Sequence, residues 1–366
     1  VYSITNDIMR SYGYLETLCN TRSGGKLQEI IIGCKKKISA LFGIQNSARI
    51  FFTYNTGYAL NLIIKGFLKN NYKTVISSFE NNATLAPLKR LEKSNNVVIL
   101  QVPASHNTLF DYEGFEKLLN WNKTHLLCVS HASEVTGDIF PITRIIEICK
   151  KYKVKTRINC SQTAGKLSFD IPGAGADFVI FPGNNFLYGF QGIGCGITSE
   201  EIELENLFEE EETAQSEKKY RKEDLIHPFE IGSFNTAGII SLSAGIDFIK
   251  RVGMDKIIGK DRELLSQFYT LLKDDQNIQF YGVNNLEEKV GIASLTIKNK
   301  NPKEVENVLY EKHGIICEGG YQANILAHKT IGTFSSGGTL RFSFSYFNTP
   351  SEVEIAAKAL MEISAK

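Results

Sequence analysis

The amino-acid sequence predicts an α/β protein with a large lobe built on a mostly parallel sheet and a smaller α+β lobe. The first observation is a series of short, continuously apolar, β-rich runs before about residue 200. The second is that helical stretches separate these runs, a pattern typical of a parallel sheet covered on both faces. The third is a change after about residue 250 to long helices with few strands, which is typical of an α+β lobe.

Each element follows from a local pattern in the chain. The expected strands of the large lobe are residues 50–53, 74–77, 97–100, 126–129 and 178–181. The expected helices between them are residues 57–68, 84–94 and 141–152, and Pro141 suits a first helical turn. Residues 293–297 and 339–343 are the expected strands of the small lobe. We therefore place the large lobe at residues 16–250 and the small lobe at residues 1–15 and 251–366.

Composition excludes several classes of protein. The 366 residues suit about two domains, and 43% hydrophobic with 22% charged residues is typical of globular chains. With 41 basic and 40 acidic side chains, the net charge of +1 is too small to attract nucleic acid or an anionic membrane. Apolar runs stop short of the ~20 residues of a bilayer span, and no signal-peptide pattern opens the chain, so we expect a cytoplasmic protein. The seven cysteines show no CxxC pair and no histidine at zinc-ligand spacing, so no metal site is predicted.

One charged stretch interrupts the pattern between the two lobes. Residues 208–224 combine a run of four glutamates with several lysines and an arginine, and they contain few apolar anchors. We interpret the stretch as a solvated loop or exposed helix, with a partner-docking segment as the alternative.

Three segments carry the chemistry-bearing motifs. Residues 52–61 (FTYNTGYALN) form a strand and a small-residue turn that opens a helix, a geometry that seats a phosphate on backbone N–H groups, here at Thr56 and Gly57. The second segment reads NCSQTAG at residues 159–165, GADFVIFPGNN at 175–185 and GFQGIG at 189–194. The third reads LAHKTIGT at residues 326–333 and RFSFSYFNT at 341–349.

Together these segments resemble the class V aminotransferase-type proteins, most closely the cysteine desulfurases and selenocysteine lyases. The resemblance follows nearly the whole chain in order. It implies the fold-type-I architecture of pyridoxal-phosphate (PLP) proteins and a dimer in which the second subunit completes the cofactor pocket.

The resemblance also shows where this chain departs from the family's catalytic pattern. Asn185 stands at the position of the lysine that forms the Schiff base with the cofactor, and Asn184 replaces the histidine before it. Asn159 replaces the aspartate that pairs with the pyridinium nitrogen, and Asn81 replaces the histidine that covers the ring. An amide cannot form an imine, so no covalently bound cofactor is expected.

Other positions depart from or match the family in the same register. Ala323 stands where the family has its sulfur-accepting cysteine, on a mobile loop, and Glu134 stands where it has an amide near the ring. Gln162 matches the residue that would hydrogen-bond the ring hydroxyl, and Arg341 matches the arginine that binds a substrate carboxylate. Ser233 matches the hydroxyl residue that reaches the partner's phosphate across the dimer interface.

Three functions remain open at this point, and the weakest is a pure interaction module in which residues 209–222 dock a partner. The leading hypothesis is a catalytically degenerate homologue of cysteine desulfurases, acting as a scaffold, regulator or non-catalytic partner subunit in a homodimer or in a heterodimer with a related chain. The alternative is a repurposed enzyme whose cleft binds a small anionic or amino-acid substrate through Arg341, His131, Glu134 and Gln162, with PLP or its amine form noncovalent or absent. Lys166 and Lys329 are expected at the surface rather than facing a cofactor.

Overall fold

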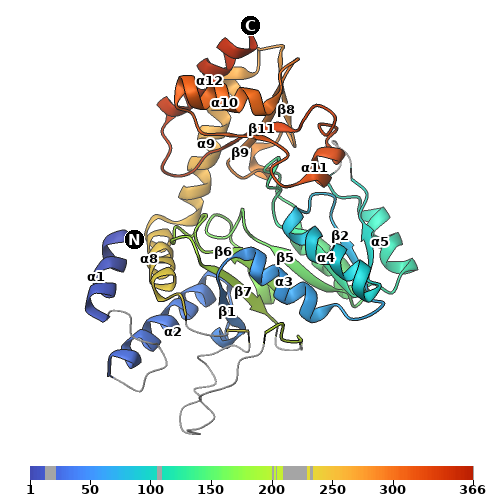
Figure 1. Cartoon of the computed structure of the whole chain (residues 1–366), viewed down its shortest axis with the longest axis vertical. Helices are drawn as coiled ribbons and strands as arrows, with labels where there is room; N and C mark the ends of the chain where they lie inside the picture. Colours follow the sequence, from blue (N-terminus) through green and yellow to red (C-terminus); the bar gives the residue numbers. More distant parts are fainter. Residues whose placement is uncertain are drawn as a thin grey trace.

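The computed structural model describes residues 1–12, 22–104, 109–199, 202, 204–208, 229–230 and 234–365. It shows two lobes, the larger one below the smaller one in Figure 1, and the long helix α9 leads from the first to the second. The expected charged stretch around residues 209–222 and Ser233 lie outside the described residues. Within the described helices, none combines the length and the apolar character needed to cross a membrane.

The large lobe contains a seven-stranded sheet in the order β1-β7-β6-β5-β4-β2-β3, in which β7 alone runs opposite to the rest. Its strands are β1 (Ile50–Thr53), β2 (Lys73–Ile76), β3 (Val98–Gln101), β4 (Leu126–Ser130), β5 (Lys155–Asn159), β6 (Phe178–Pro182) and β7 (Gly194–Thr198). The five expected strands are confirmed to within about one residue at each end. The structure adds β5 and β7, which the sequence pattern did not predict.

Helices surround this sheet and hold its two apolar faces away from water. They are α1 (Tyr2–Tyr12), α2 (Arg22–Phe42), α3 (Thr56–Phe67), α4 (Asn82–Asn95), α5 (Tyr112–Trp121), α6 (Ile142–Lys151), α7 (Ile171–Ala174) and α8 (Thr236–Val252). The side chains of β1, β4 and β6 are buried throughout, as a sheet covered on both faces requires. We expected residues 1–15 in the small lobe, but α1 packs against α8 of the large lobe (Figure 1).

The small lobe is an antiparallel sheet of four strands in the order β10-β11-β9-β8, flanked by helices. Its strands are β8 (Ile278–Tyr281), β9 (Ile292–Ile297), β10 (Glu318–Gly320) and β11 (Thr339–Ser343). Its helices are α9 (Met254–Leu272), α10 (Pro302–His313), α11 (Ile325–Thr330) and α12 (Pro350–Ser364). A separate hydrophobic core around Phe268, Leu295 and Leu360 stabilises this lobe.

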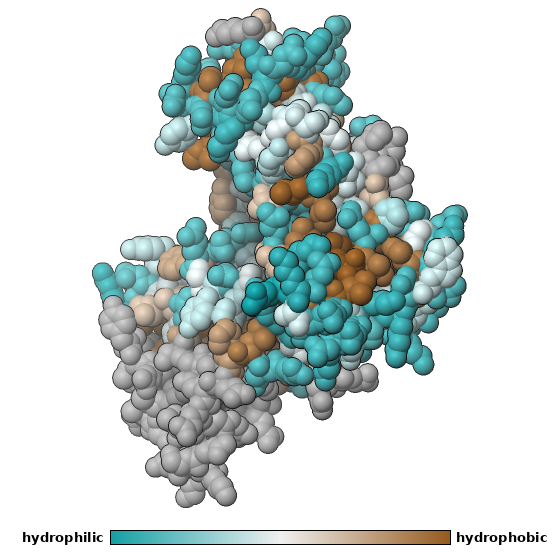
Figure 2. Space-filling view, turned by 45° about the vertical axis from the view of Figure 1, so that its right-hand side comes forward, coloured by the Kyte–Doolittle hydropathy of each residue, from teal (hydrophilic) through white to brown (hydrophobic). Residues whose placement is uncertain are grey.

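The surface between the lobes is partly apolar. Figure 2 brings the right-hand side of Figure 1 forward and shows hydrophobic residues where that side of the large lobe meets the small lobe. The elements on this side include α4, α5 and α11 (Figure 1), and Ile325 of α11 keeps 37% of its surface exposed.

Candidate functional site

The candidate site lies where β2 ends and α4 begins. Asn81 caps α4, because its side-chain oxygen accepts a hydrogen bond from the backbone N–H of Thr84 at 3.2 Å. Its side-chain nitrogen donates to both carboxylate oxygens of Glu134, at 3.0 and 2.9 Å. The Asn81 amide is therefore engaged on both sides by groups of this chain.

Glu134 and Arg341 meet at the same place, from different lobes. Burial raises the pKa of the Glu134 carboxyl, and the hydrogen bonds from Asn81 partly oppose this effect. Arg341 of β11 donates from Nη1 to the Glu134 carbonyl oxygen at 2.9 Å, and its Nη2 is paired with the Glu318 carboxylate. The guanidinium expected to bind a substrate carboxylate thus already holds a carboxylate of its own lobe.

A second group of amides lies at the end of β5. The side-chain oxygen of Asn159 accepts hydrogen bonds from the Ser161 backbone N–H, at 3.0 Å, and from the Ser161 hydroxyl. The side chain of Asn185 donates to the Ser161 carbonyl oxygen at 3.3 Å, and Asn184 donates to Asn185 at 3.4 Å. The structure therefore brings the three predicted positions together around Ser161, whereas Gln162 next to it is half-buried.

His131 follows β4 and lies beside this group, but it is buried. Its Nδ1 lies 3.0 Å from the Thr163 hydroxyl, and its ring packs on Phe169 at a centroid distance of 5.2 Å. Burial lowers the pKa of His131 to about 4, so the imidazole is neutral near pH 7. A neutral ring contributes no positive charge for binding an anion.

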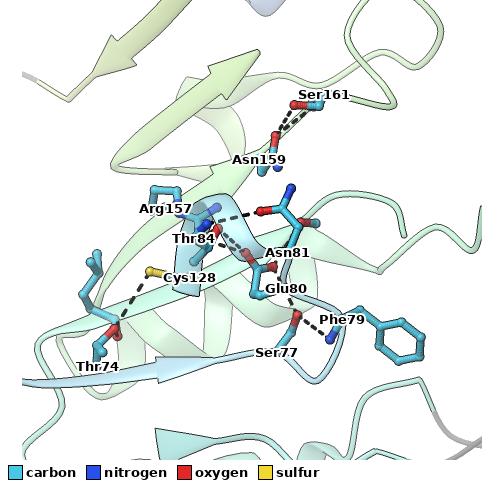
Figure 3. Close-up of polar contacts among 12 residues, drawn as sticks. Thr74, Ser77, Phe79, Glu80, Asn81, Thr84, Cys128, Arg157, Asn159 and Ser161 are labelled. Atoms are coloured by element: carbon cyan, nitrogen blue, oxygen red, sulfur yellow. Dashed lines mark hydrogen bonds and ion pairs between the residues drawn. The ribbon is translucent and has the colours of Figure 1, made fainter. Parts of the chain in front are cut away.

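A buried ion pair joins the segment before α4 to β5 (Figure 3). Glu80 and Arg157 are both fully buried, and the Arg157 Nη2 donates to the Glu80 Oε2 at 2.9 Å. The hydroxyls of Ser77, Thr84 and Ser130 also donate to the Glu80 carboxylate, at 3.0 to 3.2 Å. The pair fixes the start of α4, which carries Asn81, against β5, which ends at Asn159 (Figure 3). The sequence pattern around Arg157 does not indicate its role, because a charged residue within a polar segment gives no sign of burial.

The start of α3 keeps part of the phosphate-binding geometry. Asn55 caps this helix by accepting from the Tyr58 N–H at 2.9 Å, and Thr56 and Gly57 are half-buried in the first turn. Gly57 has only the Asn55 side chain within 4 Å of the position that a Cβ would take. The free N–H groups of a helix start of this kind favour an anion.

The comparisons with known proteins agree with this architecture. The sequence pattern of the family described as aminotransferase class-V matches residues 11–355. The chain belongs to the class-V aminotransferase family. It is 29% identical to a probable cysteine desulfurase of Methanothermobacter thermautotrophicus, over 94% of this chain and 85% of that protein. It is 28% identical to a probable cysteine desulfurase of Pyrococcus abyssi, over 90% of this chain and 82% of that protein.

Solved structures show the same fold for this class-V chain. The apo structure of a cysteine desulfurase from Thermococcus onnurineus matches with a TM-score of 0.87 at 24% identity, over 99% of this chain and 92% of that one. A NifS-like protein from Rickettsia africae matches with a TM-score of 0.84 at 21% identity, over 100% of this chain and 96% of that one. These matches confirm the predicted fold, a large lobe with a mostly parallel sheet and a smaller lobe.

The residues at the site do not fit a covalently held PLP. Asn185 offers an amide, which cannot form an imine, and that amide is bonded to the Ser161 carbonyl. Lys166 was expected at the surface, and this expectation is wrong: it is 1% exposed and paired with Asp261, because the buried Asp261 carboxylate needs a counter-charge. Lys329 is exposed, as expected.

Proposed function

We propose that this class-V chain is a catalytically degenerate homologue of cysteine desulfurases that acts as a scaffold, regulator or non-catalytic subunit. The observation that carries the proposal is the hydrogen bond from the Asn185 amide to the Ser161 carbonyl, at the position that the resemblance assigns to the Schiff-base lysine. Asn81, Asn159 and Ala323 support it, because each lacks the group that the family pattern places there. Fold alone does not confer activity, so the shared architecture is compatible with a lost chemistry.

The contacts at Arg341 favour this proposal over a repurposed enzyme with an anionic substrate. An anion would have to displace Glu318 from the guanidinium, and Glu134 adds a second carboxylate beside it. The neutral His131 supplies no compensating charge. A third function, docking of a partner on the stretch at residues 209–222, concerns residues outside those described.

The test is whether the protein forms an adduct with PLP. The purified full chain is mixed with PLP, scanned for visible absorbance, reduced with borohydride and weighed intact by mass spectrometry. We expect no reduced adduct beyond the level of an unrelated control protein that contains surface lysines. A stoichiometric adduct that peptide mapping assigns to one lysine would overturn the proposal, because it would identify a residue that has taken over the role of the missing lysine.

Asn185→Lys is the matched positive control. It returns an amine to the loop between β6 and β7 while Asn159, Asn81 and the α3 start stay unchanged. An adduct in Asn185→Lys but not in the parent would indicate that the absence of a lysine at position 185 is what prevents covalent binding of PLP. If neither protein forms an adduct, the changes at Asn81 and Asn159 also prevent binding, and the proposal stands in its stronger form.

The proposed subunit role implies a dimer with a second copy or with a related, lysine-bearing chain. Ser233 would then complete the site of the partner, as the family resemblance implies. Light scattering of the purified chain, alone and after mixing with a lysine-bearing relative, measures the assembly. A monomer under both conditions would contradict the subunit role, and the proposal would then be reduced to a regulator that acts as a monomer.

A further inference from the structure

The turn at residues 321–324, between β10 and α11, has a conformation fixed by buried polar contacts. Gln322 is 5% exposed, and its side-chain nitrogen donates to the carbonyl oxygens of Glu318 and Thr339, at 3.0 and 2.9 Å. Its side-chain oxygen lies 2.8 Å from Nε2 of His328, which is fully buried. The Asn324 N–H closes the turn by donating to the Tyr321 carbonyl oxygen at 2.7 Å. The turn is therefore anchored by the buried side chains of Gln322 and Asn324, while Tyr321 and Ala323 are exposed.

The backbone of the same turn is held in an unfavourable conformation. Gln322 and Ala323 have φ values of 41° and 52°, in the left-handed region that residues with a Cβ disfavour. Two consecutive residues of this kind persist only where the surrounding contacts over-determine the conformation. The hydrogen bonds of the buried Gln322 side chain supply contacts of that kind within the small lobe.

The contacts of the turn continue into the large lobe. The Asn324 side chain is fully buried and makes two different bonds: its nitrogen donates to the Phe79 carbonyl oxygen at 2.8 Å, and its oxygen accepts from the Ala327 N–H at 3.1 Å. The Ala323 carbonyl oxygen accepts from the Asn82 N–H at 2.9 Å. One buried amide thus joins the start of α11 to a segment 245 positions away in the chain.

The large-lobe segment that receives these bonds is part of the candidate site. Residues 79–82 run from the end of β2 into α4 and include Asn81. The amide of Asn81 holds Glu134, and the Glu134 carbonyl accepts from Arg341 of the small lobe. The hydrogen bonds and the ion pair therefore form a continuous series that runs from the turn to the start of α4, Glu134 and Arg341. The series returns to the turn through Glu318, which pairs with Arg341 and whose carbonyl oxygen accepts from Gln322.

We propose that residues 321–324 form a permanent clasp that holds the small lobe on the large lobe, with Asn324 as the buried side chain of the clasp that bonds to both lobes. The family resemblance assigns a mobile loop to this stretch, whereas the clasp is bonded to both lobes. The protein then presents one fixed two-lobed surface to a partner. This inference goes beyond the proposed function, because it concerns the motion of the chain and not its chemistry.

The test is hydrogen–deuterium exchange of the full chain, read by mass spectrometry on peptides that cover residues 79–84 and 321–330. In the parent we expect slow exchange in both peptides. Asn324→Ala removes both side-chain bonds, and we expect exchange to rise roughly tenfold in both, since a buried carbonyl and a helix start lose their partners. The matched control is Asn301→Ala, which removes an exposed cap of α10 in the same lobe and should leave both peptides unchanged.

Asn324→Ser separates the two roles of the amide. A serine hydroxyl can still cap α11, but it is too short to reach the Phe79 carbonyl. We expect faster exchange at residues 79–84 with little change at 325–330, and this variant serves if Asn324→Ala does not fold. Two results would each overturn the clasp: residues 321–324 exchanging in the parent at the rate of unstructured peptide, or Asn324→Ser leaving residues 79–84 as slow as in the parent. The PLP adduct measurement is independent, so either proposal can fail alone.

Discussion

Replacing Glu80 by glutamine should destabilise the large lobe strongly, because the change removes a charge and turns one acceptor oxygen of the carboxylate into a donor. Glu80 and Arg157 are both fully buried, and Glu80 is the carboxylate paired with the guanidinium at 2.9 Å. The Arg157 Nε and Nη1 have no hydrogen-bond partner among the described residues, so the neutral glutamine leaves a buried cation without compensation. Breaking a buried pair in this way typically costs about 3–5 kcal/mol.

Helix α4, which begins just after Glu80, offers a control for this prediction. Lys89 and Glu92 of α4 form an ion pair at the same distance, 2.9 Å, with side chains that are 60% and 41% exposed. Water screens this pair, so Glu92→Gln should cost no more than about 1 kcal/mol. We attribute the expected difference of at least about 2 kcal/mol mainly to burial, because both changes neutralise the glutamate of an ion pair with the same separation.

The assay is urea unfolding followed by far-UV circular dichroism, with the free energy of unfolding compared among the parent, Glu80→Gln, Glu92→Gln and the double variant Glu80→Gln/Arg157→Met. The double variant removes the uncompensated cation, so it should recover part of the loss seen in Glu80→Gln. The reasoning is refuted if Glu80→Gln costs no more than Glu92→Gln. It is also refuted if the double variant is less stable than Glu80→Gln, because the loss would then not come from the buried charge.

Three further predictions use other buried groups. Burial lowers the pKa of His131 and His328 to about 4, below the ordinary value of 6.5, so the unfolded chain takes up protons first as the pH falls. The contribution of the two neutral imidazoles to the free energy of unfolding should therefore be complete above pH ~7 and decline between about pH 6.5 and 4. His131→Asn should make Tm fall less steeply over this pH range, whereas an unchanged slope would contradict the prediction. Ala323→Val should destabilise by about 1–2 kcal/mol in urea, because a β-branched residue tolerates φ of 52° poorly, while Ala323→Gly should be close to neutral. Asp138→Asn should leave the fully buried Lys289 ammonium unpaired and lower the free energy of unfolding by about 3–5 kcal/mol. Burial already lowers the pKa of Lys289, so this loss should become smaller as the pH rises, which thermal unfolding at several pH values measures.

The sequence by itself determined the main strands and the fold class, because several strands are apolar along their whole length and this composition indicates burial. Strands such as β4 and β6 are apolar along their length, and a strand buried on both faces has that composition wherever it lies in the chain. The motifs around Asn159 and Asn185 follow one another in the order of the family, so the family could be named before the fold. Local pattern was sufficient for these features because each depends only on neighbouring residues.

Strands β5 and β7 show where local pattern was insufficient. Strand β5 reads KTRIN, and its Arg157 is buried only because Glu80, 77 positions earlier, supplies the opposite charge. Strand β7 reads GCGIT, and Gly196 suits the sheet because the Phe51 ring packs where a Cβ would lie. Neither segment has the composition of a buried strand, and both become strands through partners that are distant in the sequence.

The tertiary structure alone decided what the site residues do. Arg341 reads as a carboxylate-binding arginine, but folding places the Glu318 carboxylate against it. Lys166 reads as a surface lysine, but folding buries it against Asp261. Asn324 caps α11 through a local bond, whereas its second bond, to Phe79 of the other lobe, forms only when the two lobes pack together. The sequence determined which groups are present, and the packing of distant segments determined which of them are already occupied by one another.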